Sequence, residues 1–462
     1  MRILESLSWA EIASALGAQA LGSPSGAPRG ASIDSRTLEP GEIFVALKGE
    51  RVDGHEHILS AFEKGASCAV VEDPGRVPPG TFALVVCNAE RALFDLGGLI
   101  RSRSLATFVA ITGSAGKTTA KEFTAALLSA RGPVLATQGN LNNHLGVPLT
   151  LARLEDGHWA AVIECGMSRA GEISRLVHLI RPRVAAVTNV AEAHLEFFAS
   201  LDDIAAAKSE IFETMGPGDV ALAPANEPRL AKSACATAAL ARLFGEGTDS
   251  SIRAESPSMS IEGSVFELHI ADTRVQISLS VPGPHAISNF LVAAGIASAL
   301  GLSTAAIVSG ALRLRAGDNR GAVRRLQDDI LLIDDTYNSN PRALRSAIDT
   351  LSLARDRRRV ACIGDMLELG PEGPRLHREV GAALGSRIDV LLGVGSLASE
   401  IAAGASSLPP EAKKLFATSV DLASNIASLV QSHDAVLVKG SRGMRMERVV
   451  EALIAAHPGV PA

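Results

Sequence analysis

The sequence predicts an α/β protein of three domains, and three observations support that prediction. Short apolar runs, such as residues 107–111, recur along the chain and are typical of buried parallel strands. Segments of helix length separate these runs, and this alternation is typical of doubly wound sheets. At 462 residues, the chain is also longer than one compact hydrophobic core normally accommodates.

The first predicted domain, residues 1–103, is a mixed α/β domain. We expect short strands at residues 42–47, 67–72 and 82–86, and a helix at residues 58–64. Clusters of Gly and Pro between these segments predict loops. The domain should therefore combine a small sheet with helices and long connections.

The second predicted domain, residues 104–316, should hold a doubly wound parallel sheet. Its expected strands are apolar runs at residues 107–111, 160–163, 184–188 and 220–223. A polar, alternating stretch at 258–279 predicts antiparallel hairpins that interrupt the pattern. The third domain, residues 317–462, repeats strand and helix and should be Rossmann-like. Its expected strands lie at residues 330–333, 360–363, 390–392 and 435–438.

Composition and charge narrow the class of protein. A net charge of -6 argues against a nucleic-acid partner, because binding phosphate backbones needs a basic face. No window approaches 18 unbroken apolar residues, so we expect no membrane span, and the N-terminus lacks the apolar segment of a signal peptide. Five scattered cysteines favour buried, reduced thiols: Cys68, Cys87, Cys165, Cys235 and Cys362. These features predict a soluble cytoplasmic protein.

A glycine-rich segment, ITGSAGKTT at residues 111–119, lies between a predicted strand and a predicted helix at 121–130. This context favours a phosphate loop for ATP over a tight turn with a fortuitous Lys-Thr pair. Lys117 would reach the β- and γ-phosphates, and the Thr118 hydroxyl would ligate Mg²⁺. Ile111 replaces the first glycine of the standard motif, which makes a kinase or GTPase less favoured. The predicted ATP-binding residues are Gly113, Ser114, Ala115, Gly116, Lys117, Thr118 and Thr119.

Several segments resemble one enzyme family. GSAGKTT at 113–119 is similar to the loop of the Mur ligases and of folylpolyglutamate synthetase. The first domain resembles the substrate-side domain of the peptide-extending Mur ligases, with DSR at 34–36, PGEIFVAL at 40–47 and DGH at 53–55. Five segments resemble the D-alanyl-D-alanine-adding branch: GNLNNHLGVPLT at 139–150, NVAEAHLE at 189–196, DDTYNSNP at 334–341, IGDMLELG at 363–370 and VKGSRGMRME at 438–447. The resemblance covers essentially the whole chain.

This resemblance implies a function in peptidoglycan precursor synthesis. The expected reaction joins D-alanyl-D-alanine to UDP-N-acetylmuramoyl-tripeptide, with ATP and Mg²⁺ as cofactors and an acyl-phosphate as intermediate. A carboxylate is a poor electrophile, so phosphorylation must first supply a leaving group. Charge then builds on phosphoryl oxygens, which calls for cations and oriented N–H donors. We expect the protein to act as a monomer.

Four side chains are candidates for the metal site. Glu164 ends an apolar run at the carboxyl edge of the predicted sheet, where open α/β folds bind ligands, and joins Thr118 as a Mg²⁺ ligand. The resemblance implies that His194 ligates a second Mg²⁺ and that Lys208 is carbamylated to become a metal ligand. Together with Lys117, His194 and Lys208 are the expected catalytic residues. The plainer alternatives are a solvent or capping glutamate, a structural histidine and a solvated helix lysine.

Other residues are assigned to ligands through the resemblance. Asn289 would contact adenine, or instead cap a helix. Arg320 and Asp335 would bind phosphate or ribose when the domains close, although Arg320 could form an interdomain salt bridge. The candidates for the nucleotide-sugar peptide are Ser35, Arg36, Asn140, Asn142 and Asn143. The candidates for the dipeptide are Asn338, Asn340, Lys439, Ser441 and Arg442. The sequence leaves the choice within each group open, because loop asparagines are usually turn formers.

Three other functions compete with this interpretation. The Mur ligase that adds diaminopimelate or lysine one step earlier is disfavoured, because its Asp-Asn-Pro-Arg segment is absent. Folylpolyglutamate synthetase lacks the first-domain pattern at residues 34–55. A non-catalytic nucleotide-binding regulatory module would not need Glu164, His194 and Lys208 together with the phosphate loop. The sequence therefore favours an ATP-dependent ligase.

Overall fold

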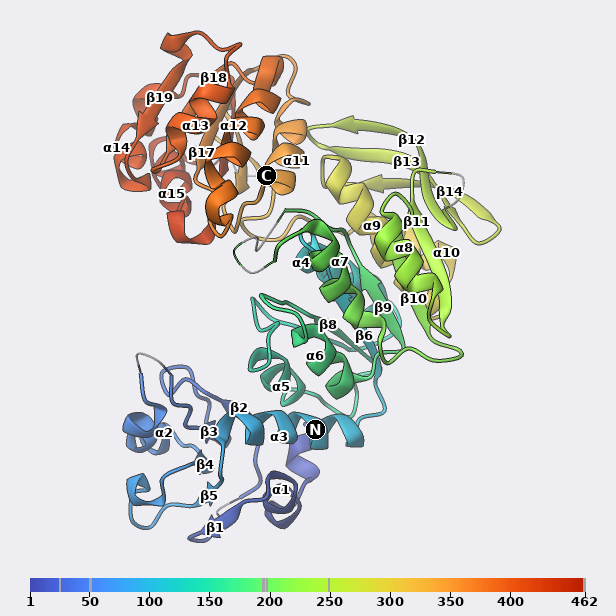
Figure 1. The fold of residues 1–462 in the computed structure, drawn as a ribbon, viewed down its shortest axis with the longest axis vertical. Helices are drawn as coiled ribbons and strands as arrows, with labels where there is room; N and C mark the ends of the chain where they lie inside the picture. The colour runs from blue at the N-terminus through green and yellow to red at the C-terminus, as the bar shows by residue number, and fades with distance from the viewer. Residues whose placement is uncertain (25, 50–51, 193–195, 197, 248–249, 460–462) are drawn as a thin grey trace.

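A computed structural model describes the chain except residues 25, 50–51, 193–195, 197, 248–249 and 460–462. Three sheets follow one another along an elongated molecule, with the first sheet at one end and the third at the other (Figure 1). Each is flanked by helices, so the predicted three-domain α/β class is confirmed. The predicted boundaries at residues 103/104 and 316/317 fall between the sheets and stay predictions.

The first sheet has five strands in the order β1-β5-β4-β3-β2. Its strands are β1 (Gln19–Leu21), β2 (Gly30–Ser32), β3 (Glu42–Val45), β4 (Cys68–Val71) and β5 (Ala83–Val85). Its helices are α1 (Trp9–Leu16), α2 (Ile58–Glu63) and α3 (Ala89–Arg103). The three predicted strands are present as β3, β4 and β5. β3 ends two residues before its predicted end, and β4 and β5 are each one residue shorter than predicted at both ends. β1 and β2 were not predicted, because three-residue strands carry too little periodicity to be recognised.

The central sheet has nine strands in the order β14-β13-β12-β11-β10-β9-β6-β8-β7. Its strands are β6 (Thr107–Thr112), β7 (Val134–Ala136), β8 (Ala160–Glu164), β9 (Val184–Val187), β10 (Val220–Pro224), β11 (Leu240–Gly245), β12 (Ile252–Ser260), β13 (Gly263–Ile270) and β14 (Thr273–Leu279). Pairing is parallel from β7 to β12 and antiparallel from β12 to β14. The predicted antiparallel hairpins are present. Contrary to the expectation, they do not interrupt the parallel sheet but add β13 and β14 to its edge.

In the part of this domain that the structure describes, the central sheet is accompanied by α4 (Lys117–Leu128), α5 (Gly146–Leu151), α6 (Glu172–Ile180), α7 (Leu201–Ser209), α8 (Pro228–Cys235), α9 (Pro284–Ala299) and α10 (Thr304–Ala311). The start predicted for α4 at residue 121 was wrong, since the helix begins at Lys117. Gly116 takes a left-handed conformation at the N-cap, with φ of 80°, so the helix can start directly after the loop.

The third sheet has six strands in the order β15-β16-β20-β17-β18-β19. Its strands are β15 (Ala322–Arg325), β16 (Leu331–Asp335), β17 (Arg358–Gly364), β18 (Val390–Val394), β19 (Lys413–Phe416) and β20 (Asp434–Lys439). Its helices are α11 (Pro341–Leu351), α12 (Gly373–Leu384), α13 (Ala398–Gly404), α14 (Ser419–Leu429) and α15 (Glu447–Ala456). Only β15 is antiparallel to its neighbour, so the Rossmann-like prediction is confirmed.

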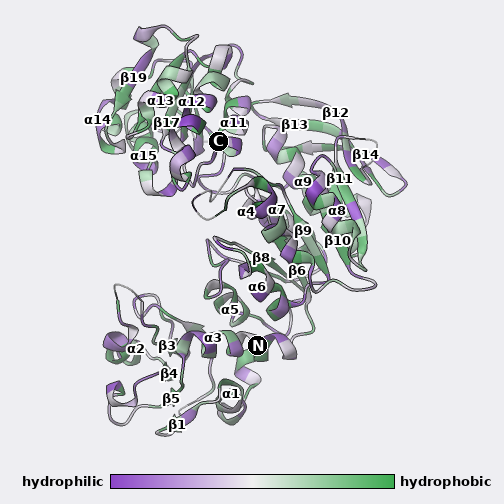
Figure 2. Cartoon of the chain, in the orientation of Figure 1, coloured by the Kyte–Doolittle hydropathy of each residue, from purple (hydrophilic) through white to green (hydrophobic). Residues whose placement is uncertain are grey.

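One face of the first sheet and one face of the central sheet share a continuous hydrophobic core, whereas the third sheet has cores of its own. Helix α3 packs against α5 and α6, which joins the first sheet to the central one. Ile261, at the tip of the β12–β13 hairpin, packs against the core of the third domain. Figure 2 shows hydrophobic residues concentrated along the strands of the central and third sheets. The third domain is therefore joined to the rest mainly through polar contacts and this hairpin.

The cysteines correct one expectation. All five are free, but only Cys68, Cys165 and Cys362 are buried, whereas Cys87 and Cys235 are exposed. Cys87 lies two residues beyond the end of β5, where the chain has left the sheet, so its apolar neighbours do not imply burial. Among the described residues, no helix combines the length and apolar character that crossing a membrane requires.

Candidate active site

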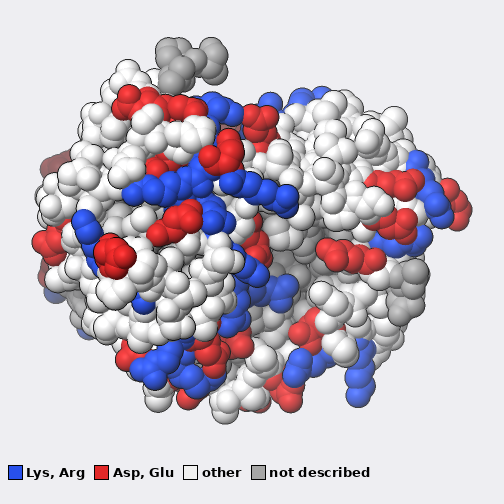
Figure 3. Space-filling model, turned by 90° about the horizontal axis from the view of Figure 1, so that it is seen from above, with Lys and Arg blue, Asp and Glu red and all other residues white. Residues whose placement is uncertain are grey.

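A cavity of about 1030 Å³ lies where the carboxyl ends of the central strands face the third domain. One wall comes from the segments after β6, β8, β9 and β10, and from the first turn of α9. The other comes from the segment after β16 and the first turn of α11. Figure 3 shows the molecule hollowed between two lobes, with basic side chains beside the hollow. Open α/β sheets bind ligands at this edge.

The phosphate loop is held in shape by the segment after β9. The amides of Ser114 and Ala115 donate to the Asn189 backbone carbonyl at 3.1 Å and to its side-chain Oδ1 at 3.0 Å. The Lys117 ammonium donates to the Gly113 carbonyl at 2.8 Å. The first N–H groups of α4 have no partner within a helix, so they are the donors left for a phosphate. An anion would thus bind at residues 116–119 rather than along the whole loop.

Gly116 cannot carry a side chain without disturbing the nucleotide side of the cavity. Its φ of 80° disfavours other residues, and a Cβ there would collide with Oδ1 of Asn289. We expect Gly116→Ala to weaken ATP binding by roughly tenfold or more, the scale of a strained backbone position. Calorimetric titration with ATP measures this. Gly157→Ala, where a Cβ meets nothing within 4 Å, is the control and should bind ATP like the parent. Equal affinities in the two variants would contradict the prediction.

Glu164 ends β8 next to the phosphate loop and is 2% exposed. Its Oε2 accepts a hydrogen bond from the Thr118 hydroxyl at 2.7 Å, and its Oε1 accepts one from the Asn142 amide at 2.8 Å. The Glu164 amide donates to Thr137 Oγ1 at 3.0 Å. No cation of the described residues forms an ion pair with this carboxylate. A buried carboxylate beside a hydroxyl is an oxygen donor set that fits a divalent cation.

Lys117 lies near this carboxylate, and Lys208 lies near Lys117. Lys208 in α7 is 2% exposed, and its ammonium has no hydrogen bond or ion pair with the described residues. Burial, together with the positive charge of Lys117, holds the pKa of Lys208 well below its usual value. Burial also lowers the pKa of Lys117, partly offset by Glu164. The two ammonium groups are thus close enough to interact. His194, the third expected catalytic residue, lies outside the described residues.

Asn289 lies within α9, whose N-cap is Gly283, so it is not a capping residue. It is 5% exposed and lines the cavity against the phosphate loop. His285, in the first turn of the same helix, also lines the cavity and has a buried Nδ1 without a hydrogen-bond partner among the described residues. Burial lowers the pKa of His285. Both side chains thus offer polar atoms to a ligand on this side.

The third domain places polar and charged groups opposite the phosphate loop. The Lys439 ammonium, 2% exposed, donates to Asp335 Oδ2 at 2.6 Å and to the Asn338 carbonyl at 2.9 Å. Arg320 lies over the ring of Tyr337, 3.6 Å from its centroid. Residues at the ends of β16 and β20 therefore meet at one point of the cavity wall.

Helix α11 touches the phosphate loop directly. Asn340 caps this helix through the Ala343 amide at 2.8 Å, and its side-chain amide donates to the Ser114 carbonyl at 3.4 Å. Arg342 donates to the Val190 carbonyl at 3.3 Å. The third domain therefore contacts both the loop and the segment that holds it.

Comparison with known proteins identifies the family. The Mur ligase middle domain matches residues 111–297, the Mur ligase glutamate ligase domain matches residues 319–442, and the Mur ligase family catalytic domain matches residues 29–95. The chain is 37% identical to the UDP-N-acetylmuramoyl-tripeptide--D-alanyl-D-alanine ligase of Escherichia coli (strain K12), over 91% of this chain and 93% of that protein. This chain belongs to the Mur ligase family.

Solved structures of Mur ligases support the assignment of this chain to the family. A crystal structure of MurF from Acinetobacter baumannii superposes with a TM-score of 0.89 and 32% identity, covering 98% of this chain and 99% of that one. MurF ligase from Thermotoga maritima in complex with ADP superposes with a TM-score of 0.82 and 28% identity, covering 93% and 97%. The fold and its order of domains are thus shared over nearly the whole length.

The structure of this Mur ligase brings most predicted site residues to one cavity. The predicted residues that line it are Ser114, Ala115, Gly116, Lys117, Thr118, Thr119, Asn140, Asn142, Asn143, Glu164, Asn289, Arg320, Asp335, Asn338, Asn340 and Lys439. Gly113 and Lys208 do not line the cavity; the Gly113 carbonyl accepts a hydrogen bond from Lys117, and the positive charge of Lys117 acts on the buried Lys208. Asn143 also accepts from the Gly146 amide at 2.9 Å, as a turn former does.

Four predicted substrate residues do not line the cavity. Ser35 and Arg36 belong to the first domain, where Arg36 is exposed and pairs with Asp34 at 2.7 Å. Ser441 is buried and accepts the Leu367 amide at 2.9 Å, which fixes the loop after β17. Arg442 is 64% exposed and lies 3.9 Å from Glu447. Their assignment to substrate stays a prediction.

Sequence reasoning did not single out five residues at or behind the cavity wall: Thr137, Asn189, His285, Tyr337 and Arg342. Asn189 lies two residues after β9 and Thr137 directly follows β7, so the rule that ligands bind at the carboxyl edge of a parallel sheet could have found them. His285 and Arg342 are in first helical turns, where no periodic pattern distinguishes them. Their positions become apparent only when the domains are placed together.

Proposed function

We propose that this chain joins D-alanyl-D-alanine to UDP-N-acetylmuramoyl-tripeptide in the cytoplasm, using ATP and an acyl-phosphate intermediate. One observation carries the proposal: the phosphate loop, the buried Glu164 and the third-domain groups all face one cavity. The D-alanyl-D-alanine ligase of Escherichia coli, 37% identical, supports the choice of substrates. We also propose that the protein acts as a monomer.

In the first step, an oxygen of the substrate carboxylate attacks the γ-phosphorus of ATP, and ADP leaves. Negative charge spreads over the phosphoryl oxygens, so positive groups aimed at them lower the barrier. Lys117 can exchange its bond to the Gly113 carbonyl for a bond to phosphate. The N–H groups at the start of α4 add fixed partial positive charge. Arg320 adds a further cation from the third domain.

In the second step, the amino nitrogen of D-alanyl-D-alanine attacks the acyl carbon. A tetrahedral intermediate forms and collapses with loss of phosphate, which leaves an amide and releases a proton. The cavity must hold two reactants and exclude water, because water would hydrolyse the acyl-phosphate. The contacts of Asn340 and Arg342 with the loop segments close one side of this space. Asn338, Lys439 and Asn340 are the groups proposed to hold the dipeptide.

Glu164, with Thr118 and a carbamylated Lys208, is proposed to hold Mg²⁺. The donor set fits, because the carboxylate is buried without an ion pair among the described residues and the hydroxyl is already at hydrogen-bond distance. When bound, Mg²⁺ supplies positive charge that stabilises the phosphoryl oxygens. A second ion would involve His194. Asn289 is proposed to contact adenine, and Asp335 with Arg320 to contact ribose or phosphate.

The substrates give the direct test. Release of ADP and phosphate is expected only when UDP-muramoyl-tripeptide and D-alanyl-D-alanine are both present, because the acyl-phosphate needs an amine acceptor for turnover. A coupled assay of ADP release measures this, with each substrate omitted in turn. The alternative is the ligase that acts one step earlier. Turnover with UDP-muramoyl-dipeptide as the carboxylate substrate, and with diaminopimelate or lysine as the amine in place of D-alanyl-D-alanine, would support that ligase instead. ATP binding without turnover in every combination would support a regulatory module.

A further inference from the structure

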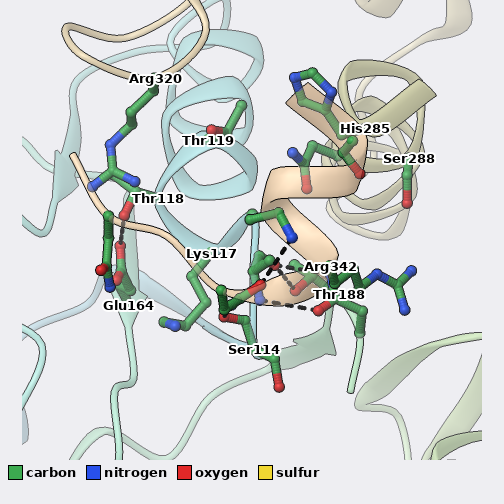
Figure 4. A pocket seen from close by; sticks show the side chains of 18 of the residues that line it. Ser114, Lys117, Thr118, Thr119, Glu164, Thr188, His285, Ser288, Arg320 and Arg342 are labelled. Carbon is green, nitrogen blue, oxygen red and sulfur yellow. Dashed lines mark hydrogen bonds between the residues drawn. The ribbon is translucent and has the colours of Figure 1, made fainter. Parts of the chain in front are cut away.

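Arg320 reaches into the cavity without an acidic partner. Among the described residues, its side chain forms no hydrogen bond and no ion pair, and its guanidinium carbon lies 3.6 Å from the centroid of the Tyr337 ring. In Figure 4 its guanidinium points toward Thr118 and Glu164. A guanidinium whose N–H groups are unused and which lies beside a phosphate loop is available to phosphoryl oxygens.

Electrostatics alone would not keep Arg320 there in the absence of ligand. Arg320 and Lys117 line the same cavity, so the two cations repel each other. An arginine side chain is long and flexible, and repulsion would favour rotamers that turn away from Lys117. The face of an aromatic ring attracts a cation through its quadrupole. Tyr337 therefore supplies the attraction that opposes this repulsion.

The backbone keeps the two side chains adjacent. The Tyr337 amide donates to the Asn319 carbonyl at 3.0 Å, and the Gly321 amide donates to the Asp334 carbonyl at 2.8 Å. These bonds continue the antiparallel pairing of β15 with β16 toward the cavity. A guanidinium stacked through its flat face leaves all its N–H edges free. Stacking thus fixes the direction of Arg320 without consuming its donors.

We propose that Tyr337, the single tyrosine of the chain, is a positioning residue that holds Arg320 ready for the phosphoryl group. The proposal rests on the proposed function, because it assigns Arg320 to the reacting phosphate. The aromatic face performs this role, and the phenolic hydroxyl is not required. Tyr337 acts through Arg320 and not on the substrate itself.

Substitutions at Tyr337 separate the ring from the hydroxyl. Tyr337→Leu should lower kcat about tenfold, the size of a desolvated cation–π contact, and change the KM for D-alanyl-D-alanine by less than about twofold. Tyr337→Phe should keep at least half of the kcat. Trp159→Leu, which removes the ring under Arg131 just before the amino end of β8, away from the cavity, is the matched control and should leave kcat unchanged. If Tyr337→Leu loses its circular dichroism signal, Tyr337→Met repeats the test with a longer apolar chain.

A double-mutant cycle decides whether the effect runs through Arg320. Lysine keeps the charge but cannot stack as a plane, so Tyr337→Leu should add no further loss of kcat in an Arg320→Lys background. Additive losses would overturn the proposal, and so would a Tyr337→Phe variant as impaired as Tyr337→Leu. If the parent protein turns over both substrates and the Tyr337→Leu variant is equally active, the role of Tyr337 is wrong but the proposed function stands. A parent protein without turnover on both substrates would overturn the proposed function first.

Discussion

Lys117→Ala should lower kcat by at least about a hundredfold, the scale of losing a charge contact made in the transition state. The Lys117 ammonium is held at the loop by the Gly113 carbonyl at 2.8 Å, beside the first turn of α4 where phosphate is proposed to bind. Burial lowers its pKa, so forming an ion pair with phosphate also relieves the cost of keeping this charge in the cavity. Steady-state assays of ADP release measure the loss.

The fold should survive this substitution, because the Lys117 side chain is only partly buried and lies outside the hydrophobic cores. Circular dichroism and thermal unfolding check this. Lys232→Ala, on the exposed side of α8, is the matched control and should keep normal turnover. A Lys117→Ala variant with turnover near that of the control would mean that this loop does not hold ATP.

Lys208→Ala should be nearly inactive, because Lys208 is proposed to be carbamylated. A free ammonium close to Lys117 and to a Mg²⁺ site is electrostatically unfavourable, and the structure gives Lys208 no acidic partner among the described residues. A carbamate reverses the charge and offers two oxygens to Mg²⁺. Added acetate or chloride should restore part of the activity of Lys208→Ala, because a small anion can occupy the vacated position. Assays of ADP release with and without these salts measure this.

The alternative of an ordinary lysine makes a different prediction. The structure contradicts the alternative of a solvated helix lysine, because Lys208 is 2% exposed. A buried lysine with a purely structural role would change stability on replacement but leave turnover unchanged, whereas the exposed control Lys232→Ala should change stability by no more than about 0.5 kcal/mol. Normal activity in Lys208→Ala would therefore exclude a role in supporting the metal. A plain amine at Lys208 in a crystal of the active protein grown with bicarbonate would exclude the carbamate alone.

Features that depend on contiguous residues could be predicted from the sequence. Strand β6, the glycine loop and helix α4 follow one another directly, so residues 107–128 specify a phosphate loop without help from distant parts. Glu164 could be placed at the carboxyl edge of the sheet because it ends an apolar run, and the parallel pairing of β8 with β6 puts that edge beside the loop. The short β1 and β2 escaped detection, because their pairing partners rather than their own composition make them strands.

Contacts between segments distant in the sequence were decided by the tertiary structure. The amides of Ser114 and Ala115 donate hydrogen bonds to Asn189 and are therefore not free to bind an anion. The N–H groups that can bind a phosphate are those at the start of α4. Arg342 lines the cavity whereas Arg442 faces solvent, although both follow strands of the third sheet. A motif fixes the local backbone, since neighbouring residues determine it. Which side chains meet across two domains depends on how the domains pack. The pairing of β15 with β16 brings Arg320 to Tyr337, but only the packing of the domains brings that pair to Lys117.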